Sequence, residues 1–310
     1  MSRFAAVVCS WHGRLARVGS HMGEAPMPRW ICAMALVMSA ANVHGASYAS
    51  RVVSYTPGTA SALWQNPSAA LGAASVLTGE NPAASNYFGF PNILSPFSPA
   101  YQGDEIVQIG EGGQLTLQLS NFATVGGGKE LGIFTNVGLI DADYPNGTNT
   151  FPATSFGGGA ANVSVSADGA NWVALGSKNF VMPSFLFPNA NPYLTAPPPS
   201  VQVADFGRPM PNGFSCFDGH DWTKTQNCFL VSQNVWSAGG DWIDLGASGL
   251  SQVGYIRFEI PSDGNPNTDL RLAIDTVAIN NAAVGSPVPE PTGLLALPLI
   301  GLALCRRRGC

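Results

Sequence analysis

The sequence predicts an all-β protein, an antiparallel β-sandwich that occupies most of the chain. Three observations point to this class. Glycine and proline are abundant, with 36 and 24 of the 310 residues. No long stretch repeats its apolar residues with the period of a helix, whereas several short stretches alternate apolar and polar residues with the period of a strand. Without the two ends, about 240 residues remain, which is enough for one large β domain.

The clearest strand is 114–120, QLTLQLS, in which every second residue is leucine. Such alternation is expected of a sheet with one face on the core and one face in water. The segment 162–166, NVSVS, repeats the pattern. It is followed by Asp168-Gly169, a dipeptide typical of tight turns, and by a second apolar segment that starts at Trp172. These features predict a β-hairpin.

Two further strands are predicted near the end of the body. The segment 255–260 alternates apolar with polar residues. In 270–279 the apolar residues stand at even positions before Asp275 and at odd positions after Thr276. A β-bulge at this point would restore burial on one face. The alternative is a strand that is covered on both faces.

The segment 286–310 has three parts in a fixed order: a motif (Val288, Pro289, Glu290 and Pro291), an uncharged apolar run at 292–305, and Arg306, Arg307 and Arg308. This order resembles the PEP-CTERM sorting signal of Gram-negative bacteria. The resemblance implies that an exosortase in the inner membrane processes the tail, so that the protein passes to the cell surface or an extracellular matrix. As a helix the run spans about 21 Å, against a hydrocarbon core of about 30 Å. We therefore expect a short C-terminal transmembrane helix that anchors the protein transiently, with the arginines as a cytoplasmic stop signal.

The N-terminal part supplies a matching entry signal. A basic start at 27–29 is followed by an apolar run at 30–41 and by small residues around Ala46, which predicts a signal helix. Residues 1–26 show no clear pattern; they are either a long basic leader or the result of an early start codon, and we favour Met27 as the true start. The expected divisions are 1–46 for leader and signal peptide, 47–284 for the β-sandwich domain, and 285–310 for the linker and sorting signal.

The section 180–240 has no regular period and contains proline clusters, so we expect loops or insertions at one rim of the sandwich. It holds the two cysteines of the body, Cys216 and Cys228. In an exported chain, two cysteines predict one disulfide. The alternative is a metal site that includes His220, which lies between them.

The body is acidic once the ends are removed. From residue 50 to residue 287 it carries 17 acidic and 7 basic residues, a net charge of −10. Such a surface repels nucleic acid and anionic lipid and attracts divalent cations. We expect no nucleic-acid partner. The expected partners are the export machinery, the exosortase and polysaccharide, with membrane contact through the C-terminal segment. The plain alternative is that the acidic surface only keeps an exported protein soluble.

Four segments of the body, 161–172, 239–245, 253–258 and 272–279, resemble in their order bacterial cell-surface jelly rolls related to discoidin-like domains. The first segment contains Ser-x-Asp-Gly-x-x-Trp, the pattern of a hairpin with a buried tryptophan. The resemblance implies a jelly-roll topology. It also implies relatives that bind glycans or surfaces, some of them with structural calcium, but it carries over no individual ligand residue.

No organic cofactor is expected, but two loops offer the oxygen ligands that calcium prefers. They are Asp141 with Asp143, and Asp263 with Asn265, Asn267 and Asp269. Neither loop has the spacing of an EF-hand. Because Asp and Asn also satisfy the backbone of ordinary turns, a plain turn is the alternative for either loop.

Three tryptophans, Trp222, Trp236 and Trp242, are candidates for stacking on sugar rings, although tryptophan is as often a core residue. Catalysis is not expected: His220 is the one histidine of the body, and no Gly-x-Ser-x-Gly elbow occurs. The sequence therefore predicts an exported structural or adhesive protein of the cell surface or matrix. The first alternative is a carbohydrate-binding module of an exopolysaccharide matrix. The second is a glycan-active enzyme, which would need two carboxylates at a set distance from each other, and this distance depends on the fold.

Overall fold

The computed structural model describes residues 47–81, 91–188, 190–195, 203–264, 270–280 and 282–283. The predicted leader and signal peptide, and the sorting signal with its short helix, lie outside these residues. Within the described ranges no helix is both long and apolar enough to span a membrane.

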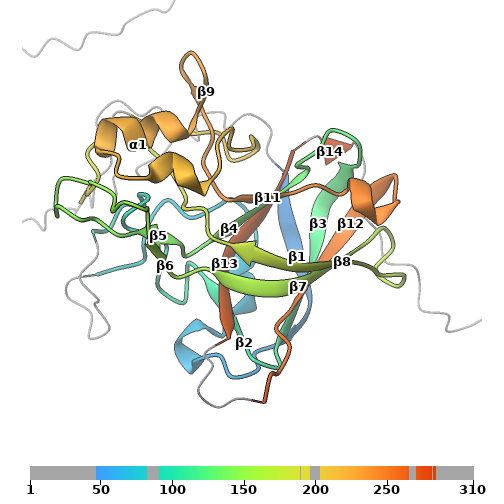
Figure 1. The fold of residues 1–310 in the computed structure, drawn as a ribbon. Coiled ribbons are helices and arrows are strands. Elements are labelled where there is room, and N and C mark those ends of the chain that lie inside the picture. Colours follow the sequence, from blue (N-terminus) through green and yellow to red (C-terminus); the bar gives the residue numbers. More distant parts are fainter. Residues whose placement is uncertain are drawn as a thin grey trace, which may run out of the picture. The chain divides into compact units, whose positions relative to one another are not determined.

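The fold is all-β and antiparallel, as predicted (Figure 1). Its main sheet has the order β11-β4-β13-β1-β3-β12-β7-β8, with β2 added to β13 and β14 added to β3. These strands are β1 (Ser47–Thr56), β2 (Val107–Gly110), β3 (Gln114–Thr124), β4 (Leu131–Thr135), β7 (Gly159–Ser166), β8 (Val173–Phe180), β11 (Asp241–Ile243), β12 (Gln252–Glu259), β13 (Arg271–Ile279) and β14 (Ala282–Ala283).

Strand β1 joins two halves of this sheet. Its first two residues, Ser47 and Tyr48, pair with β13, and its remainder, from Ala49 to Thr56, pairs with β3. The register shifts after Ala49, where the strand passes from one partner to the other. The β13 half (β2, β4, β11 and β13) and the β3 half (β3, β7, β8, β12 and β14) bury their apolar side chains against one another, which gives a sandwich-like arrangement.

The alternating segments form the strands that were predicted from them. Leu115, Leu117 and Leu119 of β3 are fully buried in the core between the two halves, which we call the first core. Strands β7 and β8 form the predicted hairpin. Its turn is closed by the Asp168 carboxylate, which accepts hydrogen bonds from the backbone of Ala170 and Asn171, both at 2.8 Å.

Strand β13 combines the two alternatives that its sequence left open. Its register against β4 shifts between Ile274 and Thr276, which marks a bulge. The bulge keeps Leu272, Ile274, Val277 and Ile279 in the first core. The strand is nevertheless covered on both faces, because Ala273 and Ala278 belong to a second cluster of buried residues.

This second cluster, which we call the second core, packs on the other face of the β13 half. Many of its large side chains come from irregular segments and short helices, among them Phe185, Phe217 and Phe229. The section 180–240 therefore builds a hydrophobic layer rather than loops alone. The short elements in this layer and around it are β5 (Gly138–Leu139), β6 (Ser155–Phe156), η3 (Phe214–Phe217), α1 (Trp222–Cys228), β9 (Leu230–Ser232) and β10 (Val235–Trp236). The remaining short helices are η1 (Ala62–Trp64), whose Trp64 also packs against the second core, η2 (Pro67–Ala70) and η4 (Gly246–Ser248).

Candidate functional site

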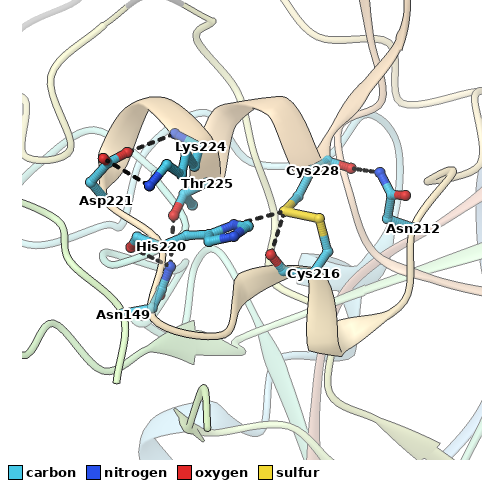
Figure 2. Close-up of a disulfide and its surroundings, with 8 residues drawn as sticks. All are labelled: Asn149, Asn212, Cys216, His220, Asp221, Lys224, Thr225 and Cys228. Atoms are coloured by element: carbon cyan, nitrogen blue, oxygen red, sulfur yellow. Dashed lines mark hydrogen bonds and ion pairs between the residues drawn. A yellow bond between two sulfur atoms is a disulfide. The ribbon is translucent and has the colours of Figure 1, made fainter. Parts of the chain in front are cut away.

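The two cysteines of the body form the predicted disulfide (Figure 2). Cys216 lies in η3 and Cys228 is the last residue of α1, and their Cα atoms are 5.9 Å apart. Helix α1 begins after Asp221, whose carboxylate accepts a hydrogen bond of 2.9 Å from the backbone of Lys224. A helix of seven residues is too short to be stable alone, so the disulfide and the second core hold it in place.

His220 lies beside the disulfide, with its Nδ1 atom 4.0 Å from the sulfur of Cys228. The ligand atoms of Cys216, His220 and Cys228 all lie within 4.8 Å of one another. This is the grouping that a metal site would require, but metals bind thiolates. Because the two sulfur atoms are bonded to each other, the oxidised protein does not offer them as thiolates. The histidine has a structural contact here, since its carbonyl accepts a 2.9 Å hydrogen bond from the backbone of Asn149.

The first candidate calcium loop uses its carboxylates to hold its own turn. One oxygen of Asp141 accepts hydrogen bonds from the backbone of Asp143 and Thr148. The other accepts from the backbone of Gly147 and from the hydroxyl of Tyr193. This pattern is that of an ordinary Asx turn. In the second candidate loop the structure describes Asp263, which has an interaction partner, while Asn265, Asn267 and Asp269 lie outside the described residues.

The three candidate tryptophans are half-buried against the second core. The ring of Trp222 lies 6.0 Å from that of Phe97, and its indole N–H donates to the carbonyl of Ala190. Trp242 donates to the carbonyl of Gly239 at 2.9 Å. Their rings thus fill the layer over the β13 half instead of forming a row in solvent.

Two other aromatic side chains are open to solvent. Tyr144 is 70% exposed and Phe151 is 82% exposed, and both lie in the connection between β5 and β6. Neither ring was predicted, because only tryptophans were expected to stack on sugars. Their position among turn-forming residues, in YPNGTNTFP at 144–152, was the available signal.

Two carboxylates, the buried Asp275 and the half-buried Asp241, lie on the β13 half. Asp275, at the bulge of β13, is 1% exposed and accepts hydrogen bonds from the backbone N–H and the hydroxyl of Ser75, at 3.0 and 2.9 Å. Asp241 of β11 accepts from the backbone of Val181 and Met182. Burial raises the pKa of each carboxyl to about 7, and the hydrogen bonds oppose this shift only in part.

These two groups predict that the protein is more stable at pH 5 than at pH 8. Their pKa values are raised on folding, so between about pH 4 and pH 7 the native state binds more protons than the unfolded state, and stability falls as pH rises. Thermal melts at a series of pH values measure the slope. The variant Asp275→Asn keeps the shape and an acceptor for Ser75 but does not titrate, so its slope should be smaller. An unchanged slope would contradict the assignment to Asp275.

Comparison with protein-family models finds no match, and comparison with curated proteins finds none either. The candidate sites therefore depend on the geometry of this chain alone.

Proposed function

We propose that this chain is an exported, non-catalytic protein of the cell surface or extracellular matrix of a Gram-negative bacterium, with a structural or adhesive role. Its C-terminal segment is the sorting signal: an exosortase reads Pro289, Glu290 and Pro291, the apolar run holds the protein transiently in the inner membrane, and Arg306 to Arg308 stay in the cytoplasm. The proposal depends on the resemblance of this segment to PEP-CTERM signals.

The structural observation that carries the proposal is the disulfide between Cys216 and Cys228. Disulfides persist in oxidising compartments and are rare in the cytosol. The bond therefore supports export of the body, independently of the two end signals. The acidic charge of the body agrees with this, because it keeps a released protein from binding nucleic acid or anionic lipid.

We further propose a jelly-roll topology for the body. The path of the chain supports it, since consecutive strands pass back and forth between the two halves. Strand β2 belongs to the β13 half, β3 to the β3 half, β4 to the β13 half, and the hairpin of β7 and β8 to the β3 half. The same exchange continues with β11, β12, β13 and β14. Such alternation is typical of double-sheet jelly rolls.

The experiment that tests the sorting proposal is cell fractionation, with detection by an antibody against the body. The full chain should be processed at both ends and recovered at the surface or in the medium. A variant lacking 286–310 should be exported but neither retained nor sorted, and a variant with Pro289, Glu290 and Pro291 all replaced by alanine should accumulate unprocessed in the inner membrane. The matched control is Val288→Ala, which leaves the Pro-Glu-Pro motif intact. Unprocessed full-length protein in the cytosol would contradict the proposal.

The second candidate is a carbohydrate-binding module of an exopolysaccharide matrix. The exposure of Tyr144 and Phe151 favours it, because flat aromatic rings in solvent are suited to sugar rings. Bound calcium stays a prediction for both loops, Asp141 with Asp143 and 263–269.

A further inference from the structure

The connection between β5 and β6 carries an unusual share of exposed apolar surface. Among the described residues, seven large hydrophobic side chains are exposed, and three of them, Ile140, Tyr144 and Phe151, lie in this connection. The other four are aliphatic, lie elsewhere in the chain and are each less than half exposed: Val53 at 45%, Leu63 at 41%, Val76 at 47% and Val181 at 39%. The two aromatic rings are therefore the most open apolar groups of the described body.

The backbone that carries these rings is held by hydrogen bonds on both sides of the connection. Ala142 donates to the carbonyl of Thr148 at 2.7 Å, which closes a hairpin around Tyr144. On the other side, Gly219 donates to the carbonyl of Thr150 at 2.8 Å, immediately before Phe151. The rings thus project from a fixed framework, and a ligand does not have to order the loop in order to bind.

Each ring also has a partner that supports it from the protein side. Tyr144 packs at 4.9 Å from Tyr193, with the two ring planes inclined at 67°, and the hydroxyl of Tyr193 donates to Asp141. Phe151 lies over Gly219, where a Cβ atom would come within 3.3 Å of the phenyl ring. Because the position next to the ring has no side chain, the ring can rest on the backbone while the rest of its surface stays open.

Acidic residues lie near both rings. Asp143 directly precedes Tyr144, and its exposed carboxylate accepts one hydrogen bond, of 3.0 Å, from Asn146. Asp218 directly precedes Gly219, and one of its oxygens accepts from the backbone of Ala153 at 2.8 Å. Carboxylates beside apolar rings disfavour anionic lipid and anionic polymers. They favour a ligand with an apolar face and hydroxyl donors, which is the chemistry of an uncharged pyranose.

We infer that Tyr144 and Phe151 are a binding platform for neutral polysaccharide. The C–H face of a sugar ring stacks on each aromatic ring, and sugar hydroxyls donate to the neighbouring carboxylates of Asp143 and Asp218. This inference rests on the proposed function, since it gives a ligand class to a protein of the extracellular matrix. It places that ligand on the β5–β6 connection and not on the three tryptophans of the second core.

The test is co-sedimentation of the full-length chain, purified in mild detergent, with insoluble cellulose, chitin and xylan. Wild-type protein should sediment with at least one of them, and the double variant Tyr144→Ala with Phe151→Ala should bind about tenfold more weakly. Phe151→Trp keeps a flat ring and should retain binding, whereas Phe151→Leu keeps an apolar side chain without a flat ring and should bind more weakly than the wild type. Leu63→Ala is the control for an exposed apolar residue elsewhere. Melting temperatures of all variants verify that the fold is intact.

Four results would overturn the inference. The first is no sedimentation with any neutral polysaccharide, and the second is binding by Phe151→Leu that is as strong as that of the wild type. The third is binding only to calcium alginate or to vesicles of phosphatidylglycerol, and the fourth is self-association of the wild type that the double variant abolishes. The last two would assign the rings to an anionic ligand or to a second copy of the chain. Because the purified chain is used, the outcome is separate from sorting. A protein that reaches the surface but binds no neutral glycan would remove this inference and leave the proposed function intact.

Discussion

Replacing Glu130 with alanine is expected to lower the free energy of unfolding by about 3 kcal/mol, because it leaves several backbone donors without an acceptor. Glu130 is fully buried and lies immediately before β4. One of its carboxylate oxygens accepts hydrogen bonds from three successive glycines, Gly126, Gly127 and Gly128, at 2.8–3.0 Å. The other accepts from the buried backbone N–H of Leu245 at 2.9 Å. One side chain therefore joins the β3–β4 loop to the segment after β11.

Denaturant unfolding followed by tryptophan fluorescence measures this effect. Asp244→Ala is the matched control. Within the described ranges this exposed neighbour accepts a hydrogen bond only from Gly246, so its loss should cost less than about 1 kcal/mol. The loss of stability of Glu130→Gln should lie between those of Glu130→Ala and Asp244→Ala, because its amide keeps one acceptor oxygen but brings an N–H₂ group toward a donor. Equal stability of Glu130→Ala and Asp244→Ala would show that the carboxylate does not hold the two segments together.

The charge on Glu130 adds a dependence on pH that is opposite to that of Asp241 and Asp275. Burial acts to raise the pKa of Glu130, but the hydrogen bonds from Leu245, Gly126 and Gly128 outweigh it and hold the pKa below its ordinary value. The stability that it contributes is present above the unfolded pKa, about 4.3, and is lost as the pH falls through the lower folded value. Together the three carboxylates place the stability maximum in mildly acidic solution.

Removing the disulfide is expected to destabilise the protein by about 3 kcal/mol on the chain-entropy account, since the bond closes a loop between residues 12 apart in sequence. The effect should be concentrated in η3 and α1, because a helix of seven residues does not persist without tertiary support. Their loosening exposes Phe217 and Phe229, which are fully buried in the second core. Thermal melts of the wild type with and without a phosphine reductant measure this loss.

The control for reduction is the double variant Cys216→Ala with Cys228→Ala. Alanine is preferred over serine because Cys228 is completely buried, and a hydroxyl there would need a hydrogen-bond partner. The variant should melt near the temperature of the reduced wild type and should not respond to the reductant. Equal melting temperatures for the oxidised and reduced wild type would contradict a stabilising role of the bond.

The strands of the sandwich could be predicted because each has one apolar face and one polar face. In β3 the leucines at 115, 117 and 119 mark the first core directly, and Asp168-Gly169 marks the turn of the β7–β8 hairpin. The second core could not be predicted in this way. Its phenylalanines, such as Phe185 and Phe229, stand in segments without a strand or helix period, so no pattern indicates which face they cover.

The candidate site, too, could be predicted only in part from the sequence. The pairing of Cys216 with Cys228 could be predicted because the body has no other cysteine. Whether an aromatic residue is exposed depends on tertiary packing and not on its type. Trp222 lies against Phe97 in the second core, whereas Phe151, with its smaller and less polar ring, stands in solvent. Residue type alone thus pointed to the tryptophans.

The pairing of β1 with β13 joins the two ends of the described chain. Ser47, at the start of the described chain, is paired with Ile279, near its end, so the seam between the two halves needs both strands at once. A polypeptide that emerges from the ribosome N-terminus first has no partner for this seam until its last strand is available. Contacts between such distant positions make folding slow and leave strand edges open in the meantime. The seam between the two halves therefore closes only after the chain has been made as far as Ile279.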